Sequence, residues 1–412
     1  MPAKKLLIIA HDFPPHGITS SRRPAGMVKY LSEFGWDTVV LTKKWTKENC
    51  NYDPEFIPNL PSKKIYEVEA NLFSGFSVAG IHERIMKLAR PGLHPYGFFK
   101  NGKKVIESMV KEEQFDAILA TAPQGNVLDL ANYASKLSGK PWVADFRDVW
   151  QWVPNLKTRF VLPLILNHEK RIVKNAAEII AVSKGFAATL SRRHDREVKV
   201  VSHGFDEELI PQNFTNSFTK FNIVYTGSVV LGSPNLRPVL DALGNLIDNG
   251  TIREEDASLD FYGNGNSSRL TDMFLGHRYA HLVKDFGSVQ REKIIQIQRN
   301  AAILLIGSHP GMRGWVTSKL FEYIISGRPI IAFPRDQDCV DEMIFETNSG
   351  ISCDEIGEVE AVLKSYYEEW KKTGFITYSG NYSAIKQYST KEQTRKLAQI
   401  LNEVVASGVH GN

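Results

Sequence analysis

Short apolar runs rich in β-branched residues recur along the chain, and most are followed by a turn and a helical pattern. In chain order they occupy residues 5–13, 37–42, 63–70, 115–123, 141–148, 178–183, 198–206, 221–228, 259–265, 281–288, 301–308, 329–333 and 349–353. Continuously apolar strands that alternate with helices predict parallel sheets covered on both faces. The runs are too numerous for one open sheet, so we predict an α/β protein with two doubly wound domains.

The helical patterns and a polar, aperiodic stretch at 202–221 predict the organisation of the domains. One helix is expected over residues 24–34, followed by Gly35, and a last helix is expected over residues 390–407. The predicted parts are an N-terminal domain over 1–205, a linker over 206–220, a second domain over 221–385 and a C-terminal helical segment over 386–412.

Composition narrows the class of protein. The chain has 412 residues, with 50 Lys and Arg against 46 Asp and Glu, and this net charge of +4 does not indicate nucleic-acid binding. Its 3 cysteines have no metal-type spacing and predict a reducing compartment without disulfides. The N-terminus lacks a signal-peptide pattern, and no apolar run approaches the roughly 18 residues of a membrane span. We therefore expect a cytoplasmic protein.

The stretch "GWVTSKLFEYIISGRPIIAF" places a lysine and a glutamate at the start of a helix between two apolar strands. Lys319 would lie in the first turn, after Thr317 or Ser318 as the cap, where backbone N–H groups favour an anion. Glu322 would lie one turn further along the same face, where a carboxylate can accept both hydroxyls of a ribose. The pair predicts a nucleoside diphosphate site. The alternative is an exposed ion pair on a surface helix.

Two other predicted strand ends carry residues suited to the same ligand. Gly227 and Ser228 follow a strand, and a glycine there permits close approach of the backbone to phosphate or sugar. In "FGSVQREKII", backbone groups of Ser288 and Val289 are candidates for the edge of a base. Each of these loops is equally consistent with an ordinary turn between a strand and a helix.

The N-terminal half offers two candidate loops. Gly17 lies between the first strand and a helix, close in sequence to Arg22 and Arg23, so the loop predicts either an anion site or a solvated segment with two surface arginines. In "ADFRDVW", charged residues end an apolar strand and need partners or a function there. We expect Asp145 to be structural and Asp148 to face a ligand, with an internal Arg–Asp pair as the alternative.

Two further stretches match patterns that can bind a metal ion or a membrane. "DQD" at 336–338 matches an Asp-x-Asp metal pattern, but no third ligand is evident, so we expect no metal site. Residues 84–104 mix basic and aromatic residues, which predicts either peripheral contact with the inner face of a membrane or a loop over the core.

Five stretches together resemble a GT-B glycosyltransferase of family 4: "DFPPHGITSSRR", "DFRDVW", "SHGFD", "YTGS" and "SKLFEYIISGRPIIA". The resemblance covers nearly the whole chain. It implies two Rossmann-like domains facing a cleft, with the C-terminal helix crossing back to the N-terminal domain. It also implies transfer of a hexose-like sugar from a UDP- or GDP-linked donor to a glycan or lipid-linked acceptor hydroxyl, with retention and without a metal or other cofactor.

The resemblance also assigns roles to residues. Glu322 matches the glutamate that holds the ribose, Lys319 lies where the diphosphate binds, and Gly17 matches the loop glycine near the donor phosphates. Lys319, Arg313 and Asp148 are the predicted catalytic residues, with positive charge stabilising the leaving diphosphate. No protein nucleophile is expected.

The chain departs from the family pattern at three places. Gly314 stands where the family usually has a second glutamate, and Ser228 and Arg237 stand near the usual Arg and Lys of the second domain. Gln124 or Asn126 occupies the region of the usual histidine. The alternative function is therefore a catalytically silent GT-B subunit that binds a nucleotide-sugar or a glycan. A dinucleotide-dependent oxidoreductase is disfavoured because the first strand lacks the glycine fingerprint.

Overall fold

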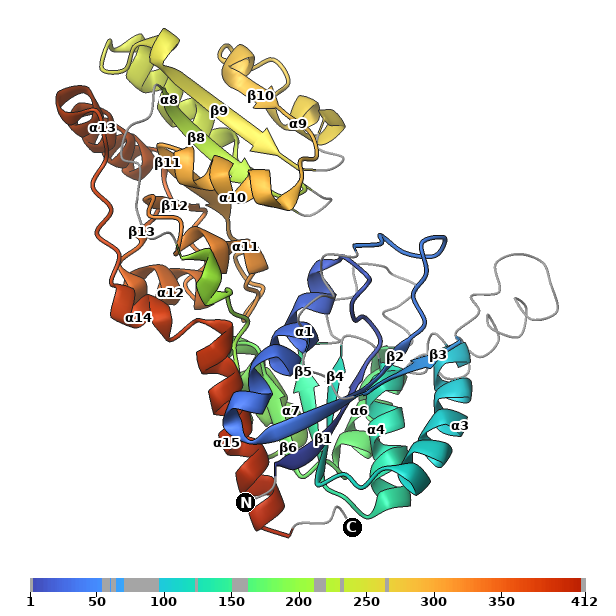
Figure 1. Ribbon diagram of the computed structural model, residues 1–412. Coiled ribbons are helices and arrows are strands. Elements are labelled where there is room, and N and C mark those ends of the chain that lie inside the picture. The colour runs from blue at the N-terminus through green and yellow to red at the C-terminus, as the bar shows by residue number, and fades with distance from the viewer. Residues whose placement is uncertain are drawn as a thin grey trace. The chain divides into compact units, whose positions relative to one another are not determined.

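The computed structural model describes residues 3–53, 60, 64–69, 96–122, 125–149, 162–210, 220–229, 233–263 and 267–408 (Figure 1). The chain divides into two compact units. Unit 1 contains Met1–Gly204 and Thr390–Asn412, and unit 2 contains Phe205–Ser389. Unit 1 is therefore discontinuous in sequence, because its last segment follows the whole of unit 2.

Unit 1 is built on a seven-stranded sheet in the order β3-β2-β1-β4-β5-β6-β7. Its strands are β1 (Lys4–Ala10), β2 (Trp36–Lys43), β3 (Lys64–Val68), β4 (Ala117–Ala122), β5 (Trp142–Phe146), β6 (Glu178–Ala181) and β7 (Lys199–Val200). All neighbouring strands pair in parallel. The order reverses direction between β1 and β4, which is the doubly wound pattern that the sequence predicts.

Helices cover both faces of this sheet. They are α1 (Thr19–Leu31), α3 (Tyr96–Glu112), α4 (Gly125–Ser138), α6 (Leu162–Val173), α7 (Lys184–His194) and α15 (Thr390–Ala406). Helix α4 packs against both α3 and α6, whereas α1 packs against α15 (Figure 1). The apolar side chains of α15 enter the same core cluster as those of α1 and β1; they are Leu397, Ala398, Ile400, Leu401 and Val404.

Helix α1 begins earlier than the predicted range 24–34. It runs over Thr19–Leu31, so Pro24 lies inside the helix. Proline has no N–H, which leaves the carbonyl of Ser20 without its usual helical donor. The guanidinium of Arg147 donates to that carbonyl from the end of β5. The prediction took Pro24 as the start because this long-range donor cannot be inferred from local sequence.

Unit 2 contains a six-stranded parallel sheet in the order β10-β9-β8-β11-β12-β13. Its strands are β8 (Phe221–Thr226), β9 (Ala257–Tyr262), β10 (Val283–Asp285), β11 (Ile303–Gly307), β12 (Ile330–Phe333) and β13 (Gly350–Ser352). Its helices are α8 (Arg237–Asp248), α9 (Ser267–Phe274), α10 (Arg291–Asn300), α11 (Ser318–Tyr323), α12 (Cys339–Thr347), α13 (Ile356–Thr373) and α14 (Tyr382–Lys386). Each run that predicts a strand, in either unit, contains one.

Alternation along β8 separates the two faces of this sheet. Ile223 and Tyr225 belong to the core cluster formed with α8 and α13. Val224 belongs to the cluster formed with α11 and α12. Since successive side chains of a strand point to opposite faces, Thr226 at the end of β8 points to the same side as Val224. It is thereby directed toward α10 and α11, where the candidate site begins.

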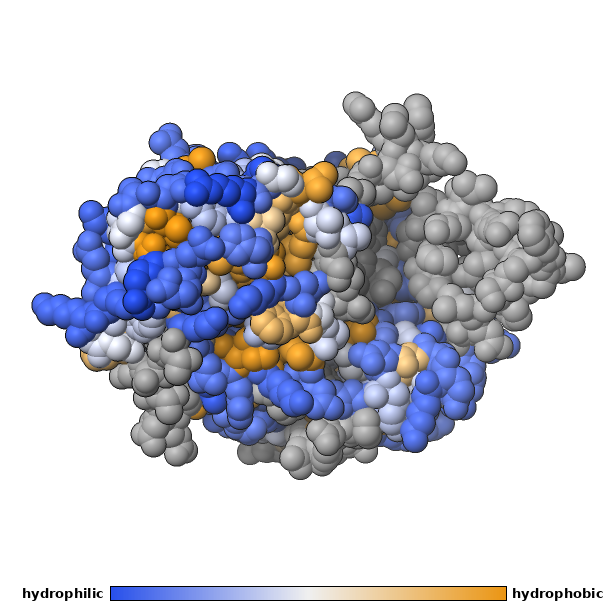
Figure 2. Space-filling view, turned by 90° about the horizontal axis from the view of Figure 1, so that it is seen from above, coloured by the Kyte–Doolittle hydropathy of each residue, from blue (hydrophilic) through white to orange (hydrophobic). Residues whose placement is uncertain are grey.

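The surface seen in Figure 2 is mostly hydrophilic, with apolar side chains gathered in limited patches. Within the described ranges, no helix is long and apolar enough to cross a membrane. Of the basic stretch 84–104, residues 84–95 lie outside the described residues, and the remainder forms the start of α3. There Phe98 is fully buried, and the amine of Lys103 lies 4.3 Å from the ring centre of Tyr133.

Candidate functional site

The carboxyl ends of four neighbouring strands of unit 2 carry the candidate site. Strand β11 leads through a loop to α11, a helix of six residues with Thr317 at its N-cap. The hydroxyl of Thr317 is buried, and it has no hydrogen-bond partner among the residues that the structure describes. A helix this short has a weak dipole, so the side chains of Lys319 and Glu322 dominate the electrostatics here.

Lys319 lies against the end of β8. Its Nζ is 3.8 Å from the ring centre of Tyr225, close enough for a cation–π interaction. A Cβ added to Gly227 would lie 2.9 Å from the same Nζ, and Gly227 has a φ of +117°. Both observations explain why glycine occupies this position, because a side chain would press on the amine and would strain the backbone.

Burial sets the protonation of this region. It lowers the pKa of Lys319 to about 7, while the nearby Glu322 carboxylate opposes the shift. Burial, assisted by the charge of Lys319, also lowers the pKa of His309. The pKa of Tyr225 is raised to about 12 by burial. The amine is therefore poised to take up a proton when an anion arrives beside it.

Glu322 is half-buried and is held from behind by α10. The amide Nε2 of Gln298 donates to Glu322 Oε2 at 3.3 Å and to Thr226 Oγ1 at 3.0 Å. The N–H of Thr226 donates to the hydroxyl of Tyr323 at 2.8 Å, and the Thr226 hydroxyl donates to it at 3.2 Å. This network connects β8, α10 and α11, so hydrogen bonds from neighbouring elements restrain the Glu322 side chain.

An aromatic pair extends the site along the sheet edge. The rings of Tyr262 and Phe286 are stacked, with centres 4.6 Å apart and planes at 6°, and Phe286 is 49% exposed. The N–H of Gly227 donates to the carbonyl of Tyr262 at 2.7 Å, and the N–H of Gly263 donates to that of Gly287 at 2.8 Å. A flat exposed ring therefore adjoins the loops that surround Lys319.

The structure places the other predicted donor residues of the second domain in unit 2. Ser318 is half-buried in the first turn of α11, and Val289 is half-buried before α10. Ser228, Ser288 and Arg313 are exposed on loops. All five follow carboxyl ends of strands, which is where ligands bind in sheets of this kind.

The backbone conformation and burial of Gly314 explain why glycine occupies this position. It is buried with a φ of +84°, and its N–H donates to the carboxylate of Asp338. Asp336 accepts the N–H groups of Asp338, Val340 and Asp341 at the start of α12. The "DQD" stretch therefore fixes two backbone segments. Within the described residues, no group of three or more His, Cys, Asp or Glu side chains is placed to hold a metal ion.

Gly17 and Asp148 belong to unit 1. The N–H of Gly17 donates to the carbonyl of Asn51 at 2.7 Å, and a Cβ at Gly17 would lie 2.6 Å from Cβ of Asp53. Close packing of two loops thus accounts for this glycine. Asp148 is half-buried after β5, and burial raises its pKa although the charge of Arg147 opposes the shift.

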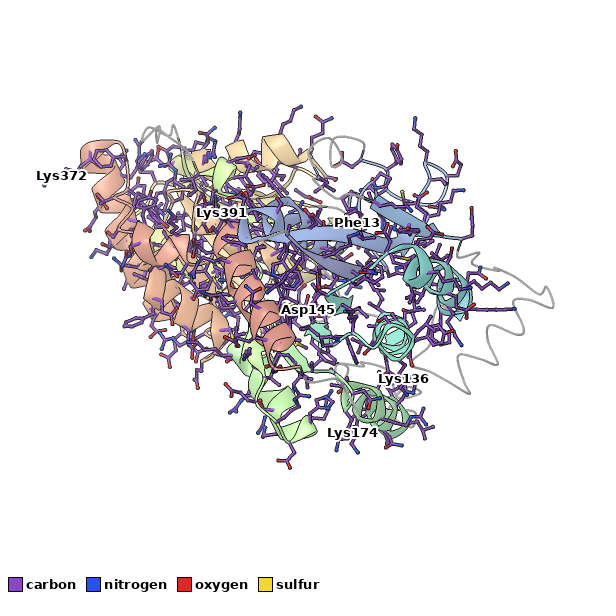
Figure 3. All side chains as sticks on the ribbon, turned by 60° about the horizontal axis from the view of Figure 1, so that its bottom comes forward. Phe13, Lys136, Asp145, Lys174, Lys372 and Lys391 are labelled. Atoms are coloured by element: carbon purple, nitrogen blue, oxygen red, sulfur yellow. The ribbon has the colours of Figure 1, made fainter. Side chains whose placement is uncertain are left out.

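Arg23 is buried and is not a surface residue. Its guanidinium forms a bidentate pair with Asp145, with Nε 2.9 Å and Nη2 2.8 Å from the two carboxylate oxygens. It also donates to the carbonyls of Val201 and Ser202. Asp145 is fully buried in the interior of unit 1 at the end of β5 (Figure 3). The internal Arg–Asp pair is present, but its arginine is Arg23.

A second polar group follows β1. His11 Nδ1 lies 2.7 Å from one oxygen of Asp12, and the Ser20 hydroxyl donates to the other oxygen at 2.7 Å. Burial raises the pKa of Asp12, but His11, Ser20 and the charge of Arg147 outweigh it and hold the pKa at about 2. Asp12 is thus a buried carboxylate that stays ionised.

Sequence reasoning missed three residues of the unit 2 site. Tyr225 and Phe286 are aromatic residues at strand ends, so their position in the predicted strands was a usable signal. Gln298 carries no such signal, because it lies in the last turn of a helix and its partners are distant in sequence.

The chain is similar to known proteins in part of its sequence and in its fold. Residues 22–209 match the profile of Glycosyltransferase Family 4. HepE of Anabaena, solved with UDP and glucose, is 14% identical with a TM-score of 0.64, over 97% of this chain and 99% of its own. A glycosyltransferase from Rickettsia africae is 14% identical with a TM-score of 0.62, over 98% of this chain and 99% of its own.

A third solved structure, the lipopolysaccharide outer core galactosyltransferase WaaB in its apo form, is 13% identical with a TM-score of 0.56. The match covers 98% of this chain and 100% of that one. At these identities the structural likeness establishes the fold. No curated protein matches the sequence.

Proposed function

We propose that this chain, which has the GT-B fold, is a family 4-like glycosyltransferase and that it moves a sugar from a nucleotide-sugar donor to a hydroxyl of a glycan or lipid-linked acceptor. The observation that carries the proposal is the placement of the Lys319 amine against Gly227, one helical turn from a supported Glu322. A cation and a ribose-type carboxylate at that spacing suit a nucleoside diphosphate.

The proposed donor is UDP- or GDP-linked. HepE was solved with UDP-glucose, which supports a UDP-linked hexose as the first donor to test. The exposed face of Phe286 suits a base, since every base presents a flat π-surface that stacks on an aromatic ring. Glu322 would then accept the ribose hydroxyls, and Lys319 would contact the diphosphate.

The other proposed donor contacts come from loops at the same strand ends. Their backbone N–H and hydroxyl groups suit phosphate and base-edge hydrogen bonds; they are Gly227, Ser228, Ser288, Val289 and Ser318. In unit 1, we assign Gly17 to the donor phosphates, as the family resemblance implies. We assign Asp148 to catalysis because it follows the end of a buried strand.

The proposed chemistry is electrostatic. When the bond from the sugar to the phosphate oxygen breaks, negative charge develops on the nucleoside diphosphate. Lys319 and Arg313 would stabilise that charge, a role that requires neither a metal nor a protein nucleophile. Retention of the anomeric configuration is proposed from the family resemblance alone. The half-charged state of Lys319 suits this role, because the incoming diphosphate favours the protonated amine.

A second candidate is a catalytically silent subunit that binds the nucleotide-sugar or a glycan. The observation that favours it is Gly314, which stands at the position of the expected second glutamate and has a left-handed backbone. This candidate keeps the nucleotide site and loses the transfer reaction.

The experiment that tests the proposal is calorimetric titration of UDP, GDP, ADP and NAD, followed by transfer assays with the matching sugar donors. We expect one nucleoside diphosphate to bind, and Glu322→Ala to weaken its binding at least tenfold while the protein stays folded. Glu368→Ala is the matched control, because Glu368 is exposed on α13. Nucleotide binding without transfer to any acceptor would favour the silent subunit, and failure of every diphosphate to bind would refute both candidates' nucleotide site.

A further inference from the structure

A buried glutamine stands behind the candidate ribose carboxylate. Gln298 is 1% exposed in the last turn of α10. Burying a primary amide is costly unless its hydrogens find acceptors. Its Nε2 has two acceptors, Thr226 Oγ1 at 3.0 Å and Glu322 Oε2 at 3.3 Å.

These two acceptors fix the amide in space. The two N–H bonds of a primary amide point in different directions within one plane, so a group that satisfies both has little rotational freedom. Thr226 is itself anchored, since its N–H and its hydroxyl both donate to Tyr323. Tyr323 is fully buried. The second amide hydrogen is therefore directed at Glu322 from a rigid base.

The same framework reaches the lysine. Gly227 directly follows Thr226, and the Lys319 amine lies against Gly227. The end of β8 thus contacts the Lys319 amine and fixes its position. It also orients the Glu322 carboxylate, because Thr226 holds Gln298 and Gln298 donates to Glu322. One framework holds both functional groups of α11.

We infer that Gln298 is a positioning residue that orients Glu322 toward the ribose, and that it thereby sets the preference of the site for ribonucleotides over 2′-deoxyribonucleotides. The inference rests on the proposed nucleotide-sugar function. Gln298 touches no ligand atom in this account, because it acts through Glu322. A carboxylate whose plane is fixed can accept two vicinal hydroxyls together, whereas a rotating one loses that advantage for the 2′-hydroxyl.

The test compares UDP with 2′-deoxy-UDP, or GDP with 2′-deoxy-GDP if guanine is the preferred base, by calorimetry at one pH. In the unmodified protein we expect the ribonucleotide to bind at least about tenfold more tightly. Gln298→Met keeps the length and bulk of the side chain but removes both donors. We expect it to weaken ribonucleotide binding about tenfold, to leave the deoxyribonucleotide nearly unchanged, and so to reduce the preference to about threefold or less.

Controls separate positioning from simple loss of stability. Gln298→Leu repeats the loss of both donors with a branched side chain, so the result does not depend on how one replacement packs. Thr347→Val removes a fully buried hydroxyl elsewhere in unit 2, where it bonds Met343 and Ser349. It is expected to lower the melting temperature without changing the ribose preference.

The outcomes are distinct. If the Gln298 variants weaken both nucleotides equally, or keep the full ribose preference, the positioning role is refuted while the proposed function stands. If the unmodified protein binds nucleotides without distinguishing the 2′-hydroxyl, the inference is also refuted. If it binds no nucleoside diphosphate at all, the proposed function fails and the inference fails with it.

Discussion

Affinity for a nucleoside diphosphate should fall as the pH rises from 7 to 9, because Lys319 loses its charge over this range. Burial lowers the pKa of its amine to about 7. The phosphates of the ligand stay ionised over this range, since a terminal phosphate has a second pKa of about 6. The neighbouring groups stay constant as well: His309 has a lowered pKa, and that of Tyr225 is about 12.

The size of the effect follows from the fraction of charged amine. With a free-state pKa of about 7, about half of the amine is charged at pH 7, about a tenth at pH 8 and about a hundredth at pH 9. If only the charged form binds, Kd rises about fivefold between pH 7 and 8 and about fiftyfold between pH 7 and 9. Calorimetry in two buffers of different ionisation enthalpy should then show uptake of about half a proton on binding at pH 7.

Stability should move in the opposite direction. The ordinary pKa of the lysine is 10.5, so between pH 7 and 10.5 the unfolded chain binds more protons than the folded one. By linkage, this group makes the free protein more stable as the pH rises through that window. Falling affinity with rising stability distinguishes Lys319 from general alkaline loss of structure.

Lys319→Arg supplies the control. Arginine remains charged at pH 9, so the variant should bind nucleotide with little dependence on pH, whatever its absolute affinity. The reasoning is refuted if the affinity of the unmodified protein does not change from pH 7 to 9, or if it changes with pH in the same way as that of Lys319→Arg.

Three further predictions concern other parts of the chain. Phe286→Ala should cost about 1–3 kcal/mol of nucleotide binding through lost stacking, measured by calorimetry, and unchanged affinity would remove the base from this ring. Gly314→Glu should not raise transfer and should lower stability by about 1–2 kcal/mol because of its φ of +84°; faster turnover at an unchanged melting temperature would contradict this. Asp145→Asn should lower the free energy of unfolding in urea by about 3–5 kcal/mol, because it leaves the buried Arg23 partly unpaired. The control Glu255→Gln, which removes an exposed ion pair, should lower it by less than about 0.5 kcal/mol.

Local patterns in the sequence predict most of the fold. Continuous apolar runs locate the strands because a parallel strand that is buried on both faces is apolar along its whole length, whichever strands it pairs with. The start of α15 at Thr390 also agrees with its pattern. The start of α1 is not predictable in this way, because Pro24 is tolerated there only with a donor from Arg147, more than a hundred residues away.

In the candidate site too, local features are predictable from the sequence and long-range contacts are not. Lys319 and Glu322 are neighbours by helical spacing alone, so the sequence predicts their proximity. The contacts that support them join α11 to β8 and α10, and their partners are far apart along the chain. Arg23 illustrates the limit in unit 1, where its partner Asp145 is 122 residues away. Pairing across elements depends on the completed sheet, which no short window of sequence contains.

The discontinuity of unit 1 has a consequence for the order in which the protein is made. The segment from Phe205 to Ser389 is continuous and can complete its own two core clusters as soon as it leaves the ribosome. Unit 1 lacks α15 until the whole of unit 2 has been made, so the apolar side chains of α1 and β1 lack their cover during that time. Unit 1 therefore reaches its final packing only after unit 2 has been synthesised, and a fragment ending at Gly204 would expose an apolar face to aggregation.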